Sequence, residues 1–469
     1  MGFYQYLKDE DLNAIHAASM EILQTAGVLF HDPQVREGLA AAGARVDGER
    51  VYLDWRLVSS LLESAPTRFL LRARDPGKSV TVGDGTYLGP GYGAPFVRSE
   101  TGGRRKALLE DYENFVRLVA SSPVLDVNGG VLVEPSDVPA PQRHVAMMAS
   151  AIRGSGKPLI GITKGQREAR DAITMARAAL GAGDSPCLIG LVNVNTPLAY
   201  DPNMLGALVE YAREGEALII ASLAMAGATA PCSIAGTLAL QNAEVLAGVC
   251  ATQALRPGCP VVYGSVSSVA DMRYGSLSMG APEASAMAAA TVQMARYYRL
   301  PSRTGGSVTD SMLPDAQGGA ESAMAMMISV LSGVNFVLHA CGILESFMTM
   351  SYEKFMLDEE FVSMLKFLAK PPSFDEEALA VDLTVQNGPG SHFLTTEHTL
   401  RHFREMWRPG LFTRGNYDVW RMAGSKDVKD KAREAWQSRL SAYSPPPLDS
   451  QVEAFFREMT QAPVDHNAL

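Results

Sequence analysis

The stretch CLIGLVNVNTPLAYDPNMLGALVEYAREGEALIIASLAMAG (residues 187–227) decides the fold. It holds an apolar run (187–195), a helical pattern (201–215) and a second apolar run (217–227). Apolar runs of this kind are typical of parallel strands that are covered on both faces, and a helix is the usual crossover between them. The stretch therefore predicts a strand–helix–strand unit.

The same order recurs through the centre of the chain. Seven predicted helices each precede an apolar strand, and the strand-like YLGPGYGAPFVRS (87–99) adds an eighth; the seven strands lie at 124–133, 157–163, 187–195, 217–227, 259–268, 301–310 and 335–344. Eight such units over about 250 residues are typical of a (β/α)8 TIM-type barrel. An open doubly wound sheet is the alternative, but no GxGxxG motif follows an early strand.

The segments outside the repeat predict additions to the barrel. We expect a mixed helical and β-rich flank at 1–85, the α/β barrel at 86–350, and a helical cap with a tail at 351–469. Residues 68–98 alternate and turn, with hairpin signals at Asp84 followed by Gly85 and at Thr101 followed by two glycines.

Composition limits the classes of function. The net charge of −10 argues against nucleic acid as the main partner, since phosphate binding needs a basic surface. The five cysteines are scattered without a CxxC pair, which favours a reducing compartment over a disulfide framework. No signal-peptide core and no charge-free run of about 18 apolar residues is found, so we expect a cytoplasmic protein without a membrane span.

Barrel enzymes place their chemistry at the carboxyl ends of the strands. In GVNFVLHACGILES (333–346), His339, Cys341 and Glu345 would share one face if the strand continued that far. His339 and Glu345 are the predicted catalytic pair. The alternative without a catalytic role is a core histidine whose hydrogen bonds are made within the protein, beside a carboxylate that begins a loop. The predicted substrate-binding residues at or near the other strand ends are Tyr92, Phe96, Asn128, Asn195, Tyr263, Arg303, Thr309 and Phe347.

Zinc ligation and a Schiff-base lysine are two other chemistries that these strand ends could support. His339 and Cys341 offer only two zinc ligands where a catalytic site needs about three, so we expect no metal. Lys164, directly after a strand, is the one lysine placed for a Schiff base, although a solvated loop lysine is the simpler reading.

Several long stretches resemble the trimethylamine methyltransferase family across nearly the whole chain. They include GPGYGAPFV (89–97), DVNGGVLVEPSDVPA (126–140), VNVNTPLAYDPNMLGALVEYA (192–212), GGSVTDSMLPDAQGGAES (305–322) and FVLHACGILESFMTMSYEKFMLDEE (336–360). The resemblance implies a (β/α)8 barrel, an oligomer, and methyl transfer from a methylamine to the Co(I) of a separate corrinoid protein. It places the family's pyrrolysine within PSRTGGSVTDSM (301–312), where this chain has only standard residues.

That departure favours the branch of the family that acts on glycine betaine and other quaternary amines. When a quaternary ammonium loses a methyl group, the leaving group is a neutral amine that needs no general acid. Alignment of the methyl group with Co(I) can therefore supply much of the rate acceleration. Aromatic faces and Glu345 would hold the ammonium; His339, Asn195 and Arg303 would hold a carboxylate. We expect no tightly bound cofactor, and a corrinoid protein docked over the barrel mouth. A trimethylamine-type enzyme, a Schiff-base lyase and a betaine-binding protein are the alternatives.

Overall fold

The computed structural model describes residues 3–98, 102–181 and 183–461, and its centre is a parallel barrel. Neighbouring strands follow the order β6-β19-β18-β15-β13-β11-β10-β9. The backbone amides of Asp126 and Val127, just before β9, donate to the Leu88 carbonyl of β6 at 2.8 and 3.2 Å and close the ring. The predicted barrel is confirmed. Its strands are β6 (Tyr87–Leu88), β9 (Asn128–Gly129), β10 (Leu159–Ile160), β11 (Leu188–Asn193), β13 (Ala217–Ser222), β15 (Val261–Ser265), β18 (Ser302–Gly305) and β19 (Phe336–Leu338).

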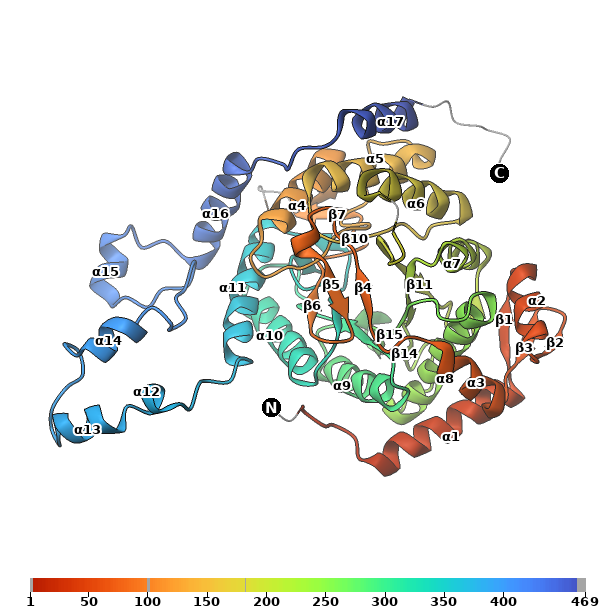
Figure 1. Cartoon of the computed structure of the whole chain (residues 1–469), viewed down its shortest axis with the longest axis horizontal. Coiled ribbons are helices and arrows are strands. Elements are labelled where there is room, and N and C mark those ends of the chain that lie inside the picture. Colours follow the sequence, from red (N-terminus) through yellow and green to blue (C-terminus); the bar gives the residue numbers. More distant parts are fainter. Residues whose placement is uncertain (1–2, 99–101, 182, 462–469) are drawn as a thin grey trace.

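Helices surround the strands, as Figure 1 shows, and seven of them connect consecutive barrel strands along the chain. Local sequence sets their ends. Before α7, the Asp201 carboxylate accepts from the amides of Asn203 and Met204, and Gly215 stops the helix in the left-handed conformation at φ 73°. The helices are α4 (Leu109–Ser121), α5 (Ala140–Gly154), α6 (Gln166–Leu180), α7 (Pro202–Glu214), α8 (Ile234–Leu255), α9 (Pro282–Tyr297) and α10 (Ala316–Leu331).

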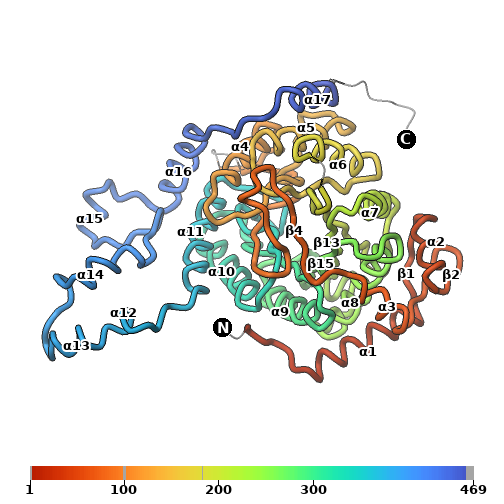
Figure 2. Tube along the Cα trace, in the orientation of Figure 1, coloured from red at the N-terminus to blue at the C-terminus, as the bar shows by residue number. Residues whose placement is uncertain are grey.

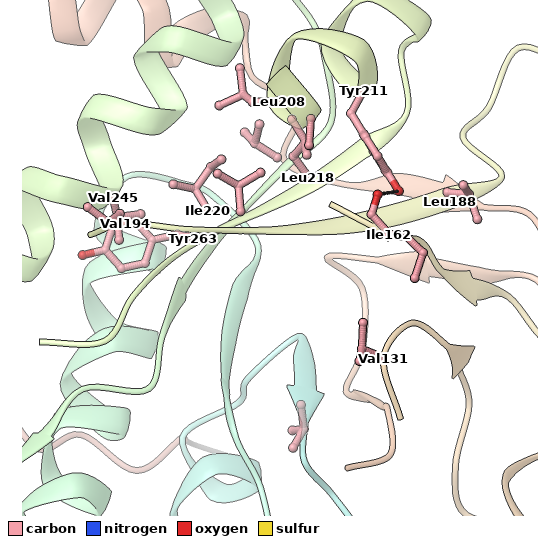
Figure 3. Packing of buried hydrophobic residues seen from close by; sticks show 14 of the residues in the cluster. Val131, Ile162, Leu188, Val194, Leu208, Tyr211, Leu218, Ile220, Val245 and Tyr263 are labelled. Atoms are coloured by element: carbon pink, nitrogen blue, oxygen red, sulfur yellow. Dashed lines mark hydrogen bonds between the residues drawn. The ribbon is translucent and has the colours of Figure 1, made fainter. Parts of the chain in front are cut away.

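Strand alternation sorts side chains between the barrel interior and the helix layer. Ile219, Val262 and Phe336 belong to the interior cluster, whereas Leu218 and Ile220 pack outward with the helices. Figure 3 shows this outer layer, with the Tyr211 hydroxyl of α7 donating to the Ile162 carbonyl at 3.2 Å. The phase of each strand therefore decides which side chains reach the interior.

A hairpin closes the amino-terminal end of the barrel. Strands β4 (Phe69–Leu71) and β5 (Val80–Val82) send Phe69, Leu71, Val80 and Val82 into the interior cluster, and the hairpin lies over the centre of the ring in Figure 1. Its connection is bonded to residues just before β10 and β11, since Asp75 N donates to Gly156 O and Arg72 N to Pro186 O, both at 2.9 Å. Access to the interior is therefore left to the carboxyl end.

The rest of the flank packs against α8. Helices α1 (Asp9–Thr25), α2 (Pro33–Ala41) and α3 (Trp55–Ser64) all contact it. Helix α8 is long and apolar enough to cross a membrane, but 83% of its most apolar window is buried inside the protein. Its composition is therefore that of a core helix. The predicted hairpin at Asp84 is wrong, because this turn joins β5 to β6, which lie in different sheets.

A second small sheet lies beyond the carboxyl end of the barrel. It is made of β7 (Phe96–Arg98), β8 (Arg104–Lys106), β20 (Ile343–Leu344) and β21 (Thr349–Met350). Strands β7 and β8 form the hairpin expected near Gly102; Thr101 lies outside the described residues. A further hairpin, β16 (Ser268–Asp271) with β17 (Ser276–Ser278), follows β15. These segments shape the barrel mouth.

The C-terminal segment is helical. Helices α11 (Tyr352–Leu368), α16 (Val428–Ala442) and α17 (Ser450–Gln461) lie along the helix layer. Between α11 and α16 the chain extends away from the barrel, which is plain in Figure 2. This extension carries the short helices α12 (Glu376–Leu379), α13 (Val381–Asn387), α14 (Glu397–His402) and α15 (Tyr417–Met422).

Candidate active site

The site is built around His339, the residue that directly follows β19. Its backbone is left-handed at φ 64°, which ends the strand alternation. The predicted common face of His339, Cys341 and Glu345 is therefore wrong. Cys341 is buried instead beside α11, where burial and the nearby Asp358 carboxylate raise its pKa well above the ordinary value. His339 itself is only 5% exposed at the carboxyl end of the barrel.

Both ring nitrogens of His339 are engaged. Nδ1 lies 3.4 Å from Arg303 Nη2, and Nε2 lies 3.2 Å from the Tyr92 carbonyl. An arginine only donates and a carbonyl only accepts, so Nδ1 accepts and the Nε2 proton is donated. Burial, together with the Arg303 charge, holds the pKa of His339 well below 6.5. The ring is thus neutral and fixed in one tautomer.

Arg303 lies on β18 and is 1% exposed. Beyond its contact with His339, its Nε and Nη1 have no hydrogen-bond partner, and it forms no ion pair with any carboxylate of the described residues. Burial lowers its pKa to about 9, so the group stays protonated at neutral pH. A buried cation without a counterion is unfavourable unless an anion binds beside it. Arg303 therefore marks a place for an anionic group.

Two aromatic rings flank His339. The Phe347 ring lies 4.5 Å from the His339 ring, centroid to centroid, and the Tyr92 ring lies 6.4 Å away at 86°. Burial raises the pKa of Tyr92 to about 12, so its hydroxyl stays neutral. Ring faces attract quaternary ammonium groups. The cluster thus combines one cationic side chain with two aromatic ones.

A strained turn holds Phe347 in place. Glu345, Ser346 and Phe347 have consecutive positive φ angles of 53°, 47° and 79°. The amide of Glu345 donates to the Ser311 carbonyl at 3.0 Å, and that of Ser346 to the Thr309 carbonyl at 2.9 Å. Such backbone persists only where its surroundings fix it, and it clusters at functional sites.

Glu345 points to a different partner from His339. Its carboxylate forms an ion pair with Arg104 at 2.5 Å, and its side chain is 12% exposed. Arg104 in turn covers the Phe96 ring at 4.3 Å. The carboxylate is therefore neutralised at the rim of the barrel. Sequence reasoning missed Arg104: its only signal is a basic run on β8, and nothing local links that run to residue 345.

Besides Phe96 and Glu345 at the rim, four predicted residues do not join the cluster. Three face the helix layer: Asn128 Nδ2 donates to the Val116 carbonyl at 3.0 Å, Tyr263 Oη to Asn242 at 2.8 Å, and Thr309 Oγ1 to Glu321 at 2.5 Å. Asn195 lies in an exposed loop, where its amide donates to the Ala199 carbonyl. The strand phase that turns Arg303 inward turns Tyr263 outward.

The structure gives little support to the two alternative chemistries, a Schiff-base lysine and a zinc site. Lys164 is half-exposed and forms an ion pair with Glu134, unlike the desolvated amine that a Schiff base needs. Over residues 3–98, 102–181 and 183–461, no three His, Cys, Asp or Glu side chains come together as a metal site. The absence of zinc stays a prediction.

Comparisons with known proteins agree over most of the chain. A family model described as trimethylamine methyltransferase (MTTB) matches residues 1–462. Glycine betaine methyltransferase of Desulfitobacterium hafniense (strain Y51) is 46% identical over 458 residues, covering 96% of this chain and 95% of that protein. Proline betaine:corrinoid methyltransferase of Eubacterium limosum is 32% identical and covers 95% of both chains.

A solved structure has the same fold. The Methanosarcina barkeri monomethylamine methyltransferase (MtmB) matches with a TM-score of 0.52 and covers 95% of this chain and 96% of its own. At 12% identity, this likeness supports the barrel fold alone.

Proposed function

This chain belongs to the trimethylamine methyltransferase family, and we propose that it moves a methyl group from glycine betaine, or a related betaine, to the Co(I) of a corrinoid protein. Two of its relatives are named for glycine betaine and proline betaine. Both of these substrates are zwitterions that carry a quaternary ammonium and a carboxylate.

The observation that carries the proposal is the lack of a counterion beside the buried Arg303. Its buried guanidinium has free donors and no carboxylate partner among the described residues. A betaine supplies the missing anion, and trimethylamine does not. The stretch 301–312, in which the family resemblance places pyrrolysine, holds Arg303 and only standard residues. Both features favour a betaine over trimethylamine.

The position of each residue along the barrel orients the substrate. Arg303 lies on a barrel strand, whereas Phe347 belongs to the rim turn beyond β19 and precedes the exposed Met348. With its carboxylate at Arg303, a betaine directs its ammonium toward Tyr92 and Phe347 and one methyl group toward the mouth. The corrinoid protein then docks over this end, because the amino-terminal end is closed by the β4–β5 hairpin.

The chemistry needs little from the protein beyond this alignment. The corrinoid of the partner is the methyl acceptor; its Co(I) supplies the electron pair of the new bond to carbon. The electrons of the broken carbon–nitrogen bond stay on nitrogen, which leaves as the neutral tertiary amine. No proton is transferred, so a neutral, fully bonded His339 is consistent with the reaction. We assign His339 to positioning Arg303, and Tyr92 and Phe347 to the ammonium.

The test is a spectroscopic assay with reduced cobalamin or a corrinoid protein. The purified chain should convert Co(I) to methyl-Co(III) with glycine betaine or proline betaine, and at least tenfold more slowly with trimethylamine or choline. Methyl-transfer rates with choline equal to those with glycine betaine would show that the substrate carboxylate has no role in recognition. Borohydride trapping of Lys164 with substrate would instead support the lyase.

A further inference from the structure

One carboxylate at the barrel mouth receives hydrogen bonds from two other loops. Asp310 lies in the loop between β18 and α10, and its Oδ1 accepts from the Met279 amide at 2.6 Å and from the Ser346 hydroxyl at 2.5 Å. Met279 lies between β17 and α9, and Ser346 lies in the strained turn between β20 and β21. The loops that follow the neighbouring barrel strands β15, β18 and β19 therefore meet at a single oxygen atom.

Asp310 has no cationic partner among the described residues, whereas Glu345 and Asp271 of the same mouth each pair with an arginine. The Ser346 hydroxyl also lies 3.1 Å from the Leu277 carbonyl, but it has one proton, which goes to the nearer Asp310. Short bonds from a hydroxyl to an ionised carboxylate are about twice as strong as neutral ones. The contacts of Asp310 therefore indicate that it serves as a hydrogen-bond acceptor for Met279 and Ser346.

Both groups that Asp310 holds bear on the Phe347 ring. Ser346 directly precedes Phe347 in the chain and has a left-handed backbone at φ 47°. Met279 belongs to a small buried apolar cluster, and Phe347 packs against that cluster. The Phe347 ring in turn lies 4.5 Å from the His339 ring, centroid to centroid. One carboxylate thus fixes both the backbone before the ring and a part of the surface on which the ring rests.

The loop that carries Asp310 is anchored to α10. Glu321 of this helix accepts from the Asp310 amide at 2.9 Å and from the Thr309 hydroxyl at 2.5 Å. Gln317 donates to the other oxygen of Glu321 at 2.9 Å. Consecutive left-handed residues other than glycine persist only where their surroundings fix them. The support for the turn therefore runs from α10 to Asp310, and from Asp310 to Ser346.

We propose that Asp310 and Ser346 are positioning residues, which hold the Phe347 ring in the orientation that receives the substrate ammonium. The inference rests on the proposed function, in which Phe347 contacts that ammonium. Asp310 acts through its two hydrogen bonds and does not touch the substrate. A ring attracts a cation that lies over its face within about 6 Å. A turn that loses Asp310 therefore weakens the hold on the ammonium and leaves the carboxylate site at Arg303 intact.

The test compares two ligands of the same shape by titration calorimetry. Glycine betaine and 3,3-dimethylbutanoate share the carboxylate and the three methyl groups, but the second has an uncharged carbon in place of the nitrogen. A change in the ratio of their affinities therefore reports a change at the ammonium. In Ser346→Ala and Asp310→Ala the ratio of betaine to dimethylbutanoate affinity should fall about three- to thirtyfold, the range that a cation–aromatic contact spans. The affinity for dimethylbutanoate itself should stay close to that of the wild type.

Asp310→Asn separates positioning from direct contact with the substrate. Both hydrogen bonds use Oδ1, and asparagine keeps this oxygen, so the affinity ratio should stay close to that of the wild type. A ratio as low as that of Asp310→Ala would show that the negative charge acts on the ammonium itself, and would overturn the positioning role. The matched control is Ser150→Ala, which removes another serine–carboxylate bond, the 3.1 Å contact with Glu113 between α5 and α4. It should keep both affinities.

Phe347→Leu distinguishes failure of this inference from failure of the proposed function. It should lower the affinity ratio as Ser346→Ala does, and adding Ser346→Ala to it should lower the ratio no further. If Phe347→Leu leaves the ratio unchanged, or the wild type binds no betaine, the proposed function fails and this inference fails with it. If Phe347→Leu lowers the ratio and Ser346→Ala does not, or if their losses add, the inference alone is overturned.

Fluorine NMR of the betaine-free protein, labelled with 4-fluorophenylalanine, observes the ring directly. The resonance of Phe347 is the one that Phe347→Leu removes. It should shift or broaden in Ser346→Ala and Asp310→Ala, and it should stay in place in Asp310→Asn and Ser150→Ala. Circular dichroism and the melting temperature show that each variant is folded. An unchanged resonance in a folded Ser346→Ala protein would overturn the inference, because the ring would then be held without Asp310.

Discussion

Replacing Arg303 by methionine should stabilise the betaine-free protein and strongly weaken betaine binding. Methionine has a similar length and no charge, so it removes the unpaired cation and retains most of the packing. The pKa of Arg303 falls from 12.5 to about 9. At 1.36 kcal/mol per pKa unit, the charge costs the native state roughly 5 kcal/mol. Losing the contact with His339 offsets about 1–3 kcal/mol of the gain.

The net expectation is a rise of about 2–4 kcal/mol in the free energy of unfolding, within the range for other replaced buried charges. Betaine affinity should fall by at least about thirtyfold, because losing a buried partner of a carboxylate costs 2 kcal/mol or more. Denaturant unfolding measures the first quantity and titration calorimetry the second. Betaine should raise the melting temperature of the wild type and leave that of Arg303→Met unchanged.

Lys354→Met is the matched control, because Lys354 is also a buried cation, at 2% exposure, but has a counterion. Its ammonium pairs with Asp358 and donates to Ser322 Oγ at 2.8 Å. Removing it strands the Asp358 carboxylate and should cost about 3–5 kcal/mol of stability. The two substitutions therefore change stability in opposite directions. An Arg303→Met protein that binds betaine as tightly as the wild type refutes the assignment, and a loss of stability matching that of Lys354→Met refutes the missing counterion.

Four further outcomes follow from the same contacts. Betaine affinity should be constant between pH 6.5 and 8 and weaken above about pH 9, because Arg303 of the free protein then loses its proton; calorimetry across this range checks it. Because the pKa of His339 is depressed in the folded protein, the unfolded chain binds more protons than the folded protein below pH 6.5, so the free energy of unfolding falls as the pH drops below that value. Urea unfolding should show a smaller fall in the His339→Gln variant than in the wild type. Burial raises the pKa of Asp358 to about 6, but this group contributes equally in both proteins. His339→Ala should weaken betaine binding about ten- to a hundredfold by releasing Arg303, and Glu345→Gln less than tenfold, because Arg104 already neutralises that carboxylate. The purified chain without any cobalamin should bind betaine in calorimetry but form no demethylated product by mass spectrometry; turnover there would contradict the need for a corrinoid acceptor.

The sequence predicts the barrel well because apolar strands and helices alternate without interruption. Each predicted strand contains an observed one, as 187–195 contains β11 and 301–310 contains β18. The predicted strands are too long, however. Apolar residues continue past the last ladder bond into turns such as 339–347, where a non-glycine left-handed backbone is fixed by tertiary contacts that no local pattern records.

The candidate site was less predictable, for two physical reasons. First, the phase of a strand decides whether a side chain faces the barrel interior or the helix layer. Arg303 and Tyr263 are both near strand ends, yet Arg303 faces the interior and Tyr263 donates to Asn242 of α8. Second, the partners are distant in sequence. Arg104 and Glu345 are 241 residues apart, so the carboxylate expected to hold the substrate proves to be paired at the rim.

Under the proposed assignment, the charges of the site make the carboxylate of the substrate more important for binding than its ammonium. His339 is neutral, Glu345 is paired with Arg104, and Arg303 is left as one unpaired positive charge. An isolated quaternary cation entering this site would add a second positive charge. At roughly 6 Å and an effective dielectric constant of about 20, the repulsion is about 3 kcal/mol, or roughly a hundredfold in affinity. Under the proposed assignment, a betaine carries its own compensating charge, so its carboxylate neutralises Arg303 while Tyr92 and Phe347 receive the ammonium. One buried arginine would then be enough for this barrel to select a zwitterion.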